Sequence, residues 1–150
     1  MYRALLASAT LLLILSPASA QTHNFGRGVS PGISQVSVMA VQSATVAFED
    51  TEHASMTKSH HGGAHVHVVT VERGMGQAAA TMNGANLREL KTVGVCDRGG
   101  GYWVKCRNGQ TIEGRLRVWD ATGKGNGVFV VRSTSNNWPR NTLSSSLSIR

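Results

Sequence analysis

Short runs of alternating apolar and polar residues recur along this chain, each about the length of a β-strand. The strand-like runs fall at about residues 33–48, 64–72, 92–96, 102–107, 111–119, 127–133 and 143–149. Asn-Gly dipeptides, which favour tight hairpin turns, stand at residues 83–84, 108–109 and 126–127. A single short helix is expected over residues 86–91, with Asn86 as its cap. The pattern predicts an all-β fold, with one antiparallel β-sandwich or barrel-like domain and at most one short helix.

The first twenty residues follow another pattern. Arg3 precedes an apolar run over residues 4–15 that is too short to span a bilayer, and Ala18-x-Ala20 supplies the small residues that a signal peptidase accepts. We therefore expect a signal peptide cleaved after Ala20 and a secreted protein, periplasmic or extracellular, without a membrane span. Residues 21–32 are expected to form an extended N-terminal arm, and residues 33–150 a single β-rich domain.

Positive charge is concentrated in the second half of the chain. The whole chain has 15 Lys and Arg against 8 Asp and Glu, a net charge of +7. Residues 91–150 hold ten of the basic and three of the acidic residues, whereas residues 21–90 hold four and five. An electrostatic partner should therefore meet the C-terminal half, and the candidates are an anionic envelope component, an acidic polysaccharide or nucleic acid. The alternative is that the charge serves solubility alone.

The two cysteines of the chain, Cys96 and Cys106, are expected to form a disulfide. An exported chain meets an oxidising compartment, where such a pair is usually bonded. The glycines at residues 99–101 can turn the chain back between them. Closing so short a loop should stabilise the fold by about 2–3 kcal/mol.

The hairpin expected at Asn108-Gly109 defines a candidate binding surface. A three-residue loop that pairs Cys106 with Ile112 keeps the apolar side chains on one face, which a two-residue turn does not. The other face then carries aromatic and basic side chains, namely Trp103, Lys105, Arg107, Arg115, Arg117 and Trp119. We call these six residues the basic Trp-flanked face. Aromatic rings among cations suit sugar rings or phosphate-bearing polymers, although long charged side chains also cover ordinary solvated faces.

Histidines are concentrated in one segment of the chain. All six lie between His23 and His67, and five fall within fifteen residues. His65 and His67 are two apart in an expected strand, so both rings should project from one face. The candidate ligands for copper or zinc are His53, His60, His61, His65 and His67. The alternative is a polar, His-rich loop without a selected metal, because such tracts bind metals promiscuously.

The C-terminal third contains three segments that together carry a family resemblance: Gly114–Asp120 (GRLRVWD), Ser135–Thr142 (SNNWPRNT) and Ser148–Arg150 (SIR). Over about residues 110–150 this pattern resembles the YolA-like family of small secreted bacterial proteins, with a weaker likeness at residues 33–41. The resemblance implies a bacterial, secreted, single-domain protein and assigns no catalytic residue.

No short stretch of the sequence forms a convincing catalytic motif. Residues 28–32 match G-x-S-x-G, but the strand before and the helix after that a nucleophile elbow needs are not indicated. We therefore expect, first, a secreted non-enzymatic β-domain that binds an envelope or extracellular polymer, a polyanion or a polysaccharide, through the basic Trp-flanked face. The alternatives are a periplasmic or extracellular copper- or zinc-binding protein that uses the His-rich loop, and a small secreted hydrolase or nuclease.

Overall fold

The backbone of this protein is organised as β-strands. The computed structural model describes residues 32–99, 101–138 and 140–150, and every helix or strand element within them is a strand. The prediction of an all-β fold is therefore confirmed. No helix in these residues is long and apolar enough to cross a membrane. The expected signal peptide, and the expected N-terminal arm up to residue 31, lie outside the described residues.

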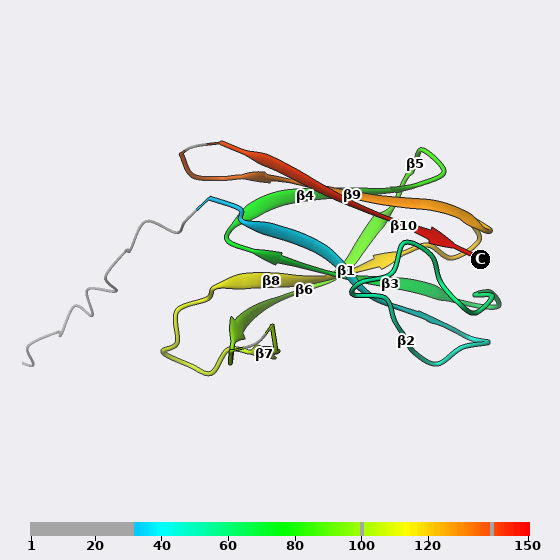
Figure 1. Ribbon diagram of the computed structural model, residues 1–150, viewed down its shortest axis with the longest axis horizontal. Coiled ribbons are helices and arrows are strands. Elements are labelled where there is room, and N and C mark those ends of the chain that lie inside the picture. The colour runs from blue at the N-terminus through cyan, green and yellow to red at the C-terminus, as the bar shows by residue number, and fades with distance from the viewer. Residues whose placement is uncertain (1–31, 100, 139) are drawn as a thin grey trace, which may run out of the picture.

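The strands form two antiparallel sheets, which Figure 1 shows as separate layers. The six-stranded sheet has the order β2-β1-β3-β8-β6-β7 and curls into a half-barrel, so we call it the curled sheet. Its strands are β1 (Gln35–Ser43), β2 (Glu49–Asp50), β3 (Val66–Arg73), β6 (Arg88–Asp97), β7 (Trp103–Lys105) and β8 (Gly114–Asp120). The second sheet has the order β10-β9-β4-β5. Its strands are β4 (Gly76–Met82), β5 (Ala85–Asn86), β9 (Gly127–Ser135) and β10 (Thr142–Ile149).

The hydrophobic core lies between the two sheets. Val66 and Val68 of β3 belong to one buried cluster with Met82, Phe129 and Leu147 of the second sheet, and each of these residues is at most 8% exposed. Removing a large apolar side chain from water stabilises the fold by about 1.5–3 kcal/mol. Because strand side chains alternate, the odd-numbered residues of β3 face away from this core.

A buried ionic cluster extends this interior beyond the apolar core. Arg117 of β8 is 7% exposed, and its Nη1 donates to Glu89 Oε2 (2.7 Å) and its Nη2 to Glu72 Oε1 (3.1 Å). Arg117 Nη2 also donates to the Gly76 carbonyl of β4 (2.9 Å), and the second Glu72 oxygen accepts a 2.5 Å hydrogen bond from Ser133 of β9. The cluster thus ties the curled sheet to the second sheet through charge-assisted hydrogen bonds.

Two predictions about individual elements are wrong. Residues 86–91 form no helix, because they end β5 and begin β6, and the amide of Leu87 donates to Ala80 O of β4 (2.9 Å). So short a helix is unstable in water, whereas the neighbouring strand β8 offers a ladder of backbone partners. Strand β4 is absent from the predicted strands because its alanine-rich sequence has low β-propensity, and pairing with β9 makes it a strand.

The expected pairing of β7 with β8 across Asn108-Gly109 is also wrong. Strand β6 lies between them, where its Cys96 pairs with Val104 of β7 and its Val93 pairs with Leu116 of β8. Residues 106–113 therefore form a connection that crosses β6 rather than a hairpin loop. The error matters for the candidate binding surface, because the partner of a strand decides which of its faces is exposed.

The predicted disulfide between Cys96 and Cys106 is confirmed, with the two Cα atoms 5.2 Å apart. It closes a hairpin between β6 and β7. In the turn that follows β6, the Arg98 amide donates to Tyr102 O (3.0 Å). Strand β7 is an edge strand of three residues, so this covalent link is a large part of what holds it in place.

Candidate functional site

A groove opens on the face of the curled sheet that points away from the second sheet. Its volume is about 470 Å³, within the range of about 300–1,000 Å³ typical of ligand sites. It is lined by Met39, Ala40, Phe48, Asp50, Glu52, Val69, Val71, Gly101, Tyr102, Trp103 and Leu116. The lining combines residues at both edges of the sheet with residues of its central strands, because the sheet curls around the space. We call it the concave groove.

Strand alternation decides which side chains form the groove floor. Val69 and Val71 of β3 line the groove, whereas Val68 belongs to the core between the sheets. In β8, Leu116 lines the groove while its neighbour Arg117 turns to the interior. The floor is therefore apolar and rigid, because it is the back of a strand pair that is anchored on its other side.

The two edges of the curled sheet approach one another across the groove. A Cβ added at Gly101, just before β7, would lie 4.0 Å from Glu52 Oε1, just after β2. Residues from opposite edges of the sheet can therefore contact one ligand.

Aromatic rings stand around the groove at both of these edges. Phe48 precedes β2 and is 67% exposed, and Tyr102 precedes β7 and is 77% exposed. Trp103 is half-buried, and the guanidinium carbon of Arg73 lies 4.9 Å from its ring centroid. Single exposed rings are ordinary, but rings gathered at one cavity indicate a binding surface.

An ion pair holds Arg73 above the ring of Trp103. Arg73 Nη2 donates to the carboxylate of Asp97 in β6. This hydrogen bond, followed by one from the amide of Gly99, holds the pKa of Asp97 below its usual value. The Trp103 ring, the Arg73 guanidinium and the Asp97 carboxylate therefore contact one another in series on the β7 side of the groove.

The β2 side of the groove carries two carboxylates, those of Asp50 and Glu52. Asp50 Oδ1 accepts a hydrogen bond from the backbone amide of Glu52 (3.0 Å). Among the described residues, which include all eight acidic side chains, five carboxylates form ion pairs with Arg or His: Glu49, Glu72, Glu89, Asp97 and Asp120. Neither Asp50 nor Glu52 has such a partner there, although the chain has 15 basic residues.

The basic Trp-flanked face is not assembled as predicted. Three of its members turn to the second sheet, namely Arg115, which reaches Gly76 O (3.5 Å), and the buried pair Arg117 and Trp119. The Nε1 of Trp119 donates to Thr70 Oγ1 (2.9 Å) within the interior. Lys105 and Arg107 are exposed at the β7 edge, and Trp103 lines the concave groove. The cause is the insertion of β6, since β8 packs against β3 and β6 and takes its orientation from them.

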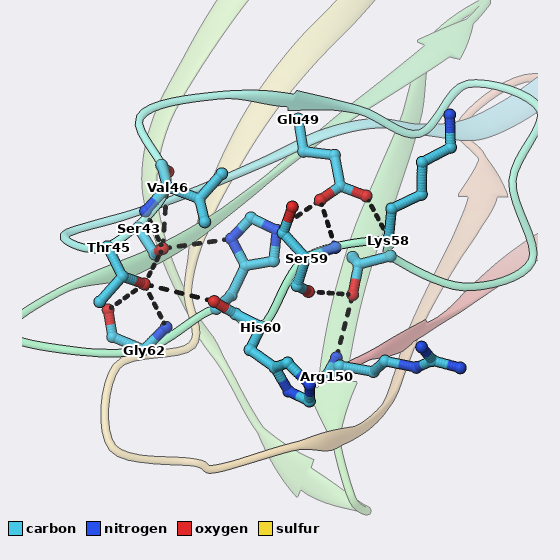
Figure 2. A network of polar contacts seen from close by, with 11 residues as sticks. Ser43, Thr45, Val46, Glu49, Lys58, Ser59, His60, Gly62 and Arg150 are labelled. Atoms are coloured by element: carbon cyan, nitrogen blue, oxygen red, sulfur yellow. Dashed lines mark hydrogen bonds and ion pairs between the residues drawn. The ribbon is translucent and has the colours of Figure 1, made fainter.

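The buried side chain of His61 contacts Ser43 and Glu49, two of the labelled residues in the polar network of Figure 2. Its Nδ1 lies 3.2 Å from Ser43 Oγ and its Nε2 lies 3.2 Å from Glu49 Oε2. Glu49 also accepts hydrogen bonds from the amides of Lys58 (2.5 Å) and Ser59 (3.0 Å). Burial acts to raise the pKa of Glu49, but these hydrogen bonds outweigh it and hold that pKa below its usual value. The network fastens the segment between β2 and β3 to the end of β1.

The same segment is tied to the end of the chain. The amide of His61 donates to Arg150 O (2.5 Å), and the amide of Arg150 donates to Thr57 Oγ1 (3.0 Å). A parallel bridge joins Met56 to Ser148 of β10. The segment between β2 and β3 therefore connects the two sheets.

Ser43, His61 and Glu49 have the residue types of a hydrolase triad, but their arrangement is that of a structural network. Ser43 is 3% exposed, and its oxygen accepts the amide of Val46 (3.0 Å) and lies 3.1 Å from Thr45 Oγ1. A catalytic nucleophile needs an oxygen that a substrate can reach. The buried hydroxyl of Ser43 does not meet that requirement.

The structure does not gather the five candidate metal ligands into one shell. Within the described part of the chain, no three His, Cys, Asp or Glu side chains are grouped as a metal site. Both ring nitrogens of His61 are engaged, and His53 and His60 are exposed on the loop. His65 and His67 do lie together, with ring centroids 5.3 Å apart. Metal binding by that pair stays a prediction.

Of the residues that line the groove, only Trp103 is among the predicted site residues. The aromatic and acidic lining residues that the sequence did not indicate are Phe48, Asp50, Glu52 and Tyr102. The first three fall where a strand was expected to end in a polar loop. The signal that could have found them is local charge, because three of the five acidic residues in residues 21–90 stand within residues 49–52, directly after an aromatic residue.

Comparison with known proteins identifies a family without assigning an activity. No curated protein and no solved structure matches this chain significantly. A family model described as "Domain of unknown function (DUF4879)" matches residues 21–149, which is most of the chain. The chain therefore belongs to the DUF4879 family.

Proposed function

We propose that this protein is a secreted, non-enzymatic binding domain that holds an extracellular polysaccharide in the concave groove. The observation that carries the proposal is the composition of the groove: an apolar floor, the rings of Phe48, Tyr102 and Trp103, and the carboxylates of Asp50 and Glu52.

A sugar ring matches these elements in chemistry. Its C–H faces are apolar and stack on aromatic rings, and its hydroxyl groups donate hydrogen bonds to carboxylates, which are strong acceptors. Phe48 and Tyr102 stand at opposite edges of the curled sheet, so one ligand in the groove can contact both. The groove is also open to solvent, which a polymer needs if its chain is to continue beyond the bound units.

The local charge favours a polysaccharide over a polyanion as the ligand of this groove. Asp50 and Glu52 would repel phosphate or sulfate groups at close range. Arg73, whose guanidinium lies over the Trp103 ring, is already paired with Asp97. A polyanion would have to bind elsewhere on this basic protein.

The sequence and the disulfide support a location outside the cytoplasm. The expected signal peptide ends at Ala20, and disulfides such as Cys96–Cys106 persist in oxidising compartments. The resemblance of residues 110–150 to the YolA-like family is consistent with this location and stays a prediction.

The proposal is tested by removing the two most exposed rings of the groove. The double variant Phe48→Ala/Tyr102→Ala should fold normally, because both side chains are mostly in solvent. Its affinity for soluble polysaccharides that the wild type binds should fall by about tenfold or more, measured by affinity electrophoresis or calorimetry.

The matched control is Trp138→Ala, which removes an aromatic side chain that is 86% exposed and lies outside the groove lining. This variant should bind like the wild type. Equal losses in both variants, or wild-type protein that binds no polysaccharide in a broad panel, would contradict the proposed function.

A further inference from the structure

One complete set of ring, cation and carboxylate stands beside the concave groove, and its ring, Trp103, belongs to the groove lining. Arg73 lies over Trp103, 4.9 Å from the ring centroid, and its guanidinium pairs with Asp97. A cation between an aromatic ring and a carboxylate is stabilised by the ring quadrupole and by the opposite charge together. The fold of this protein thus already places a cation in such surroundings.

A second set of rings and carboxylates lines the same groove. Phe48 and Tyr102 supply the rings, and Asp50 and Glu52 supply the carboxylates. Glu52 lies beside the turn that carries Tyr102, since its Oε1 is 4.0 Å from the Cβ position of Gly101. Within the described residues, no Lys, Arg or His forms an ion pair with either carboxylate.

Three of the eight carboxylates, those of Asp50, Glu52 and Glu113, have no ion pair among the described residues. With 15 Lys and Arg against 8 acidic residues, cations are in excess, and five of the carboxylates do form ion pairs. Two of the three carboxylates without an ion pair, those of Asp50 and Glu52, line a cavity that also exposes aromatic rings. Charge complementarity favours a ligand that carries a positive charge.

We propose that Asp50 and Glu52, together with Phe48 and Tyr102, bind a protonated amino group of the ligand, so that the polysaccharide is an amino-sugar polymer with free amines. This inference rests on the proposed function and specifies its substrate class. The sugar rings stack on the aromatic side chains, and the ammonium group sits between the rings and the two carboxylates. N-acetylation removes the positive charge and should therefore remove the preference.

The test compares three oligosaccharides of equal length by isothermal titration calorimetry with the mature chain. The probes are a β-1,4-linked glucosamine oligomer, its fully N-acetylated form, and the corresponding glucose oligomer. The free-amine oligomer should bind about tenfold more tightly than the other two. Its advantage should decrease with added salt, and should disappear as the pH is raised through the pKa of the sugar amine.

Variants assign the preference to the two carboxylates. Asp50→Asn/Glu52→Gln keeps the size of both side chains and should abolish the preference, so that the free-amine, N-acetylated and glucose oligomers bind this variant with similar affinity. The control Asp120→Asn/Glu113→Gln changes the net charge by the same amount with one Asp and one Glu outside the groove lining. It should retain the preference. Thermal unfolding of each variant confirms that it is folded.

The outcomes separate this inference from the function it rests on. Equal affinity for the free-amine and N-acetylated oligomers, or a preference that survives Asp50→Asn/Glu52→Gln, would overturn the amine site while the polysaccharide groove stands. Loss of the preference in the control variant as well would trace it to overall charge and would also overturn the site. No binding of any of the three oligomers would overturn the amine site, and no binding across the broad polysaccharide panel as well would overturn the proposed function.

Discussion

Two pairs of carboxylates on opposite faces of the curled sheet have different surroundings. Glu72, which is buried, and Glu89, whose side chain is 32% exposed, share the guanidinium of Arg117. Asp50 and Glu52 line the concave groove and have no cation partner among the described residues. A charge removed from water must be paired, whereas a charge in an open groove keeps its hydration. The acids paired with Arg117 therefore stabilise the fold, and the groove acids are available to a ligand.

The largest effect should come from removing the shared cation of the interior. Arg117→Met leaves Glu72 buried with its charge uncompensated, so the free energy of unfolding should fall by about 3–5 kcal/mol, measured by urea denaturation. The matched control is Arg88→Met. The Arg88 side chain is 76% exposed in its ion pair with Asp120, and its loss should cost about 0–1 kcal/mol. Similar losses in both variants would contradict a larger role for the buried Arg117 than for the exposed Arg88.

A smaller effect on stability is expected from the disulfide, with an added effect on the groove. Cys96→Ser/Cys106→Ser should lower the free energy of unfolding by about 2–3 kcal/mol. Because Trp103 and Tyr102 stand in or beside β7, affinity for a groove ligand should fall as well. The same double variant with unchanged ligand affinity would mean that β7 holds its place without the covalent link. Calorimetry and urea unfolding on one preparation give both quantities.

Acid should weaken the ion pair between Glu89 and Arg117. Burial acts to raise the pKa of Glu89, but hydrogen bonds from Thr92 and Arg117 hold it below its usual value of 4.5. A lowered folded-state pKa means that the stability contributed by Glu89 is complete above that usual value and is lost as pH falls through the folded-state pKa.

Glu89→Gln should therefore reduce stability at neutral pH by about 1 kcal/mol, with little further difference from the wild type in strong acid. Urea unfolding over a pH series measures both curves. Curves that stay parallel from neutral pH into acid would show that the Glu89 carboxylate does not supply this dependence.

The smallest effect on stability is expected from the groove acids. Asp50→Asn/Glu52→Gln should change the free energy of unfolding by no more than about 0.5 kcal/mol, because neither carboxylate has an ion pair to lose. A loss of about 2 kcal/mol or more, the scale of a buried polar group left without a partner, would show that Asp50 and Glu52 stabilise the fold, as Glu72 does.

The alternation of residues 114–120 predicts strand β8 correctly but assigns its two faces wrongly. In residues 114–120 the alternation of basic and aromatic with aliphatic side chains is plain, and the aliphatic face was expected to be the inner one. The structure turns Arg117 and Trp119 inward, where Glu72 compensates the charge and Thr70 accepts the indole N–H. Leu116 then forms the groove floor. The polar partners that make this burial favourable come from another strand.

The groove itself was predictable only in part. Trp103 was singled out as a binding residue and does line the groove, but Phe48 and Asp50 lie far from it in sequence. They meet because β2 and β7 form the two edges of one curled sheet. Edge-to-edge proximity depends on the curvature of the whole sheet, which no local pattern of residues expresses.

Local pattern was sufficient for the all-β class, most of the strands and the Cys96–Cys106 disulfide, because each depends on residues close together in the chain. Strand order was not available from that pattern. Alternation allows two phases for every strand, and the insertion of β6 between β7 and β8 selects one of them by long-range packing. That selection buries Arg117 and Trp119 of the expected binding surface and leaves the concave groove on the other face of the sheet.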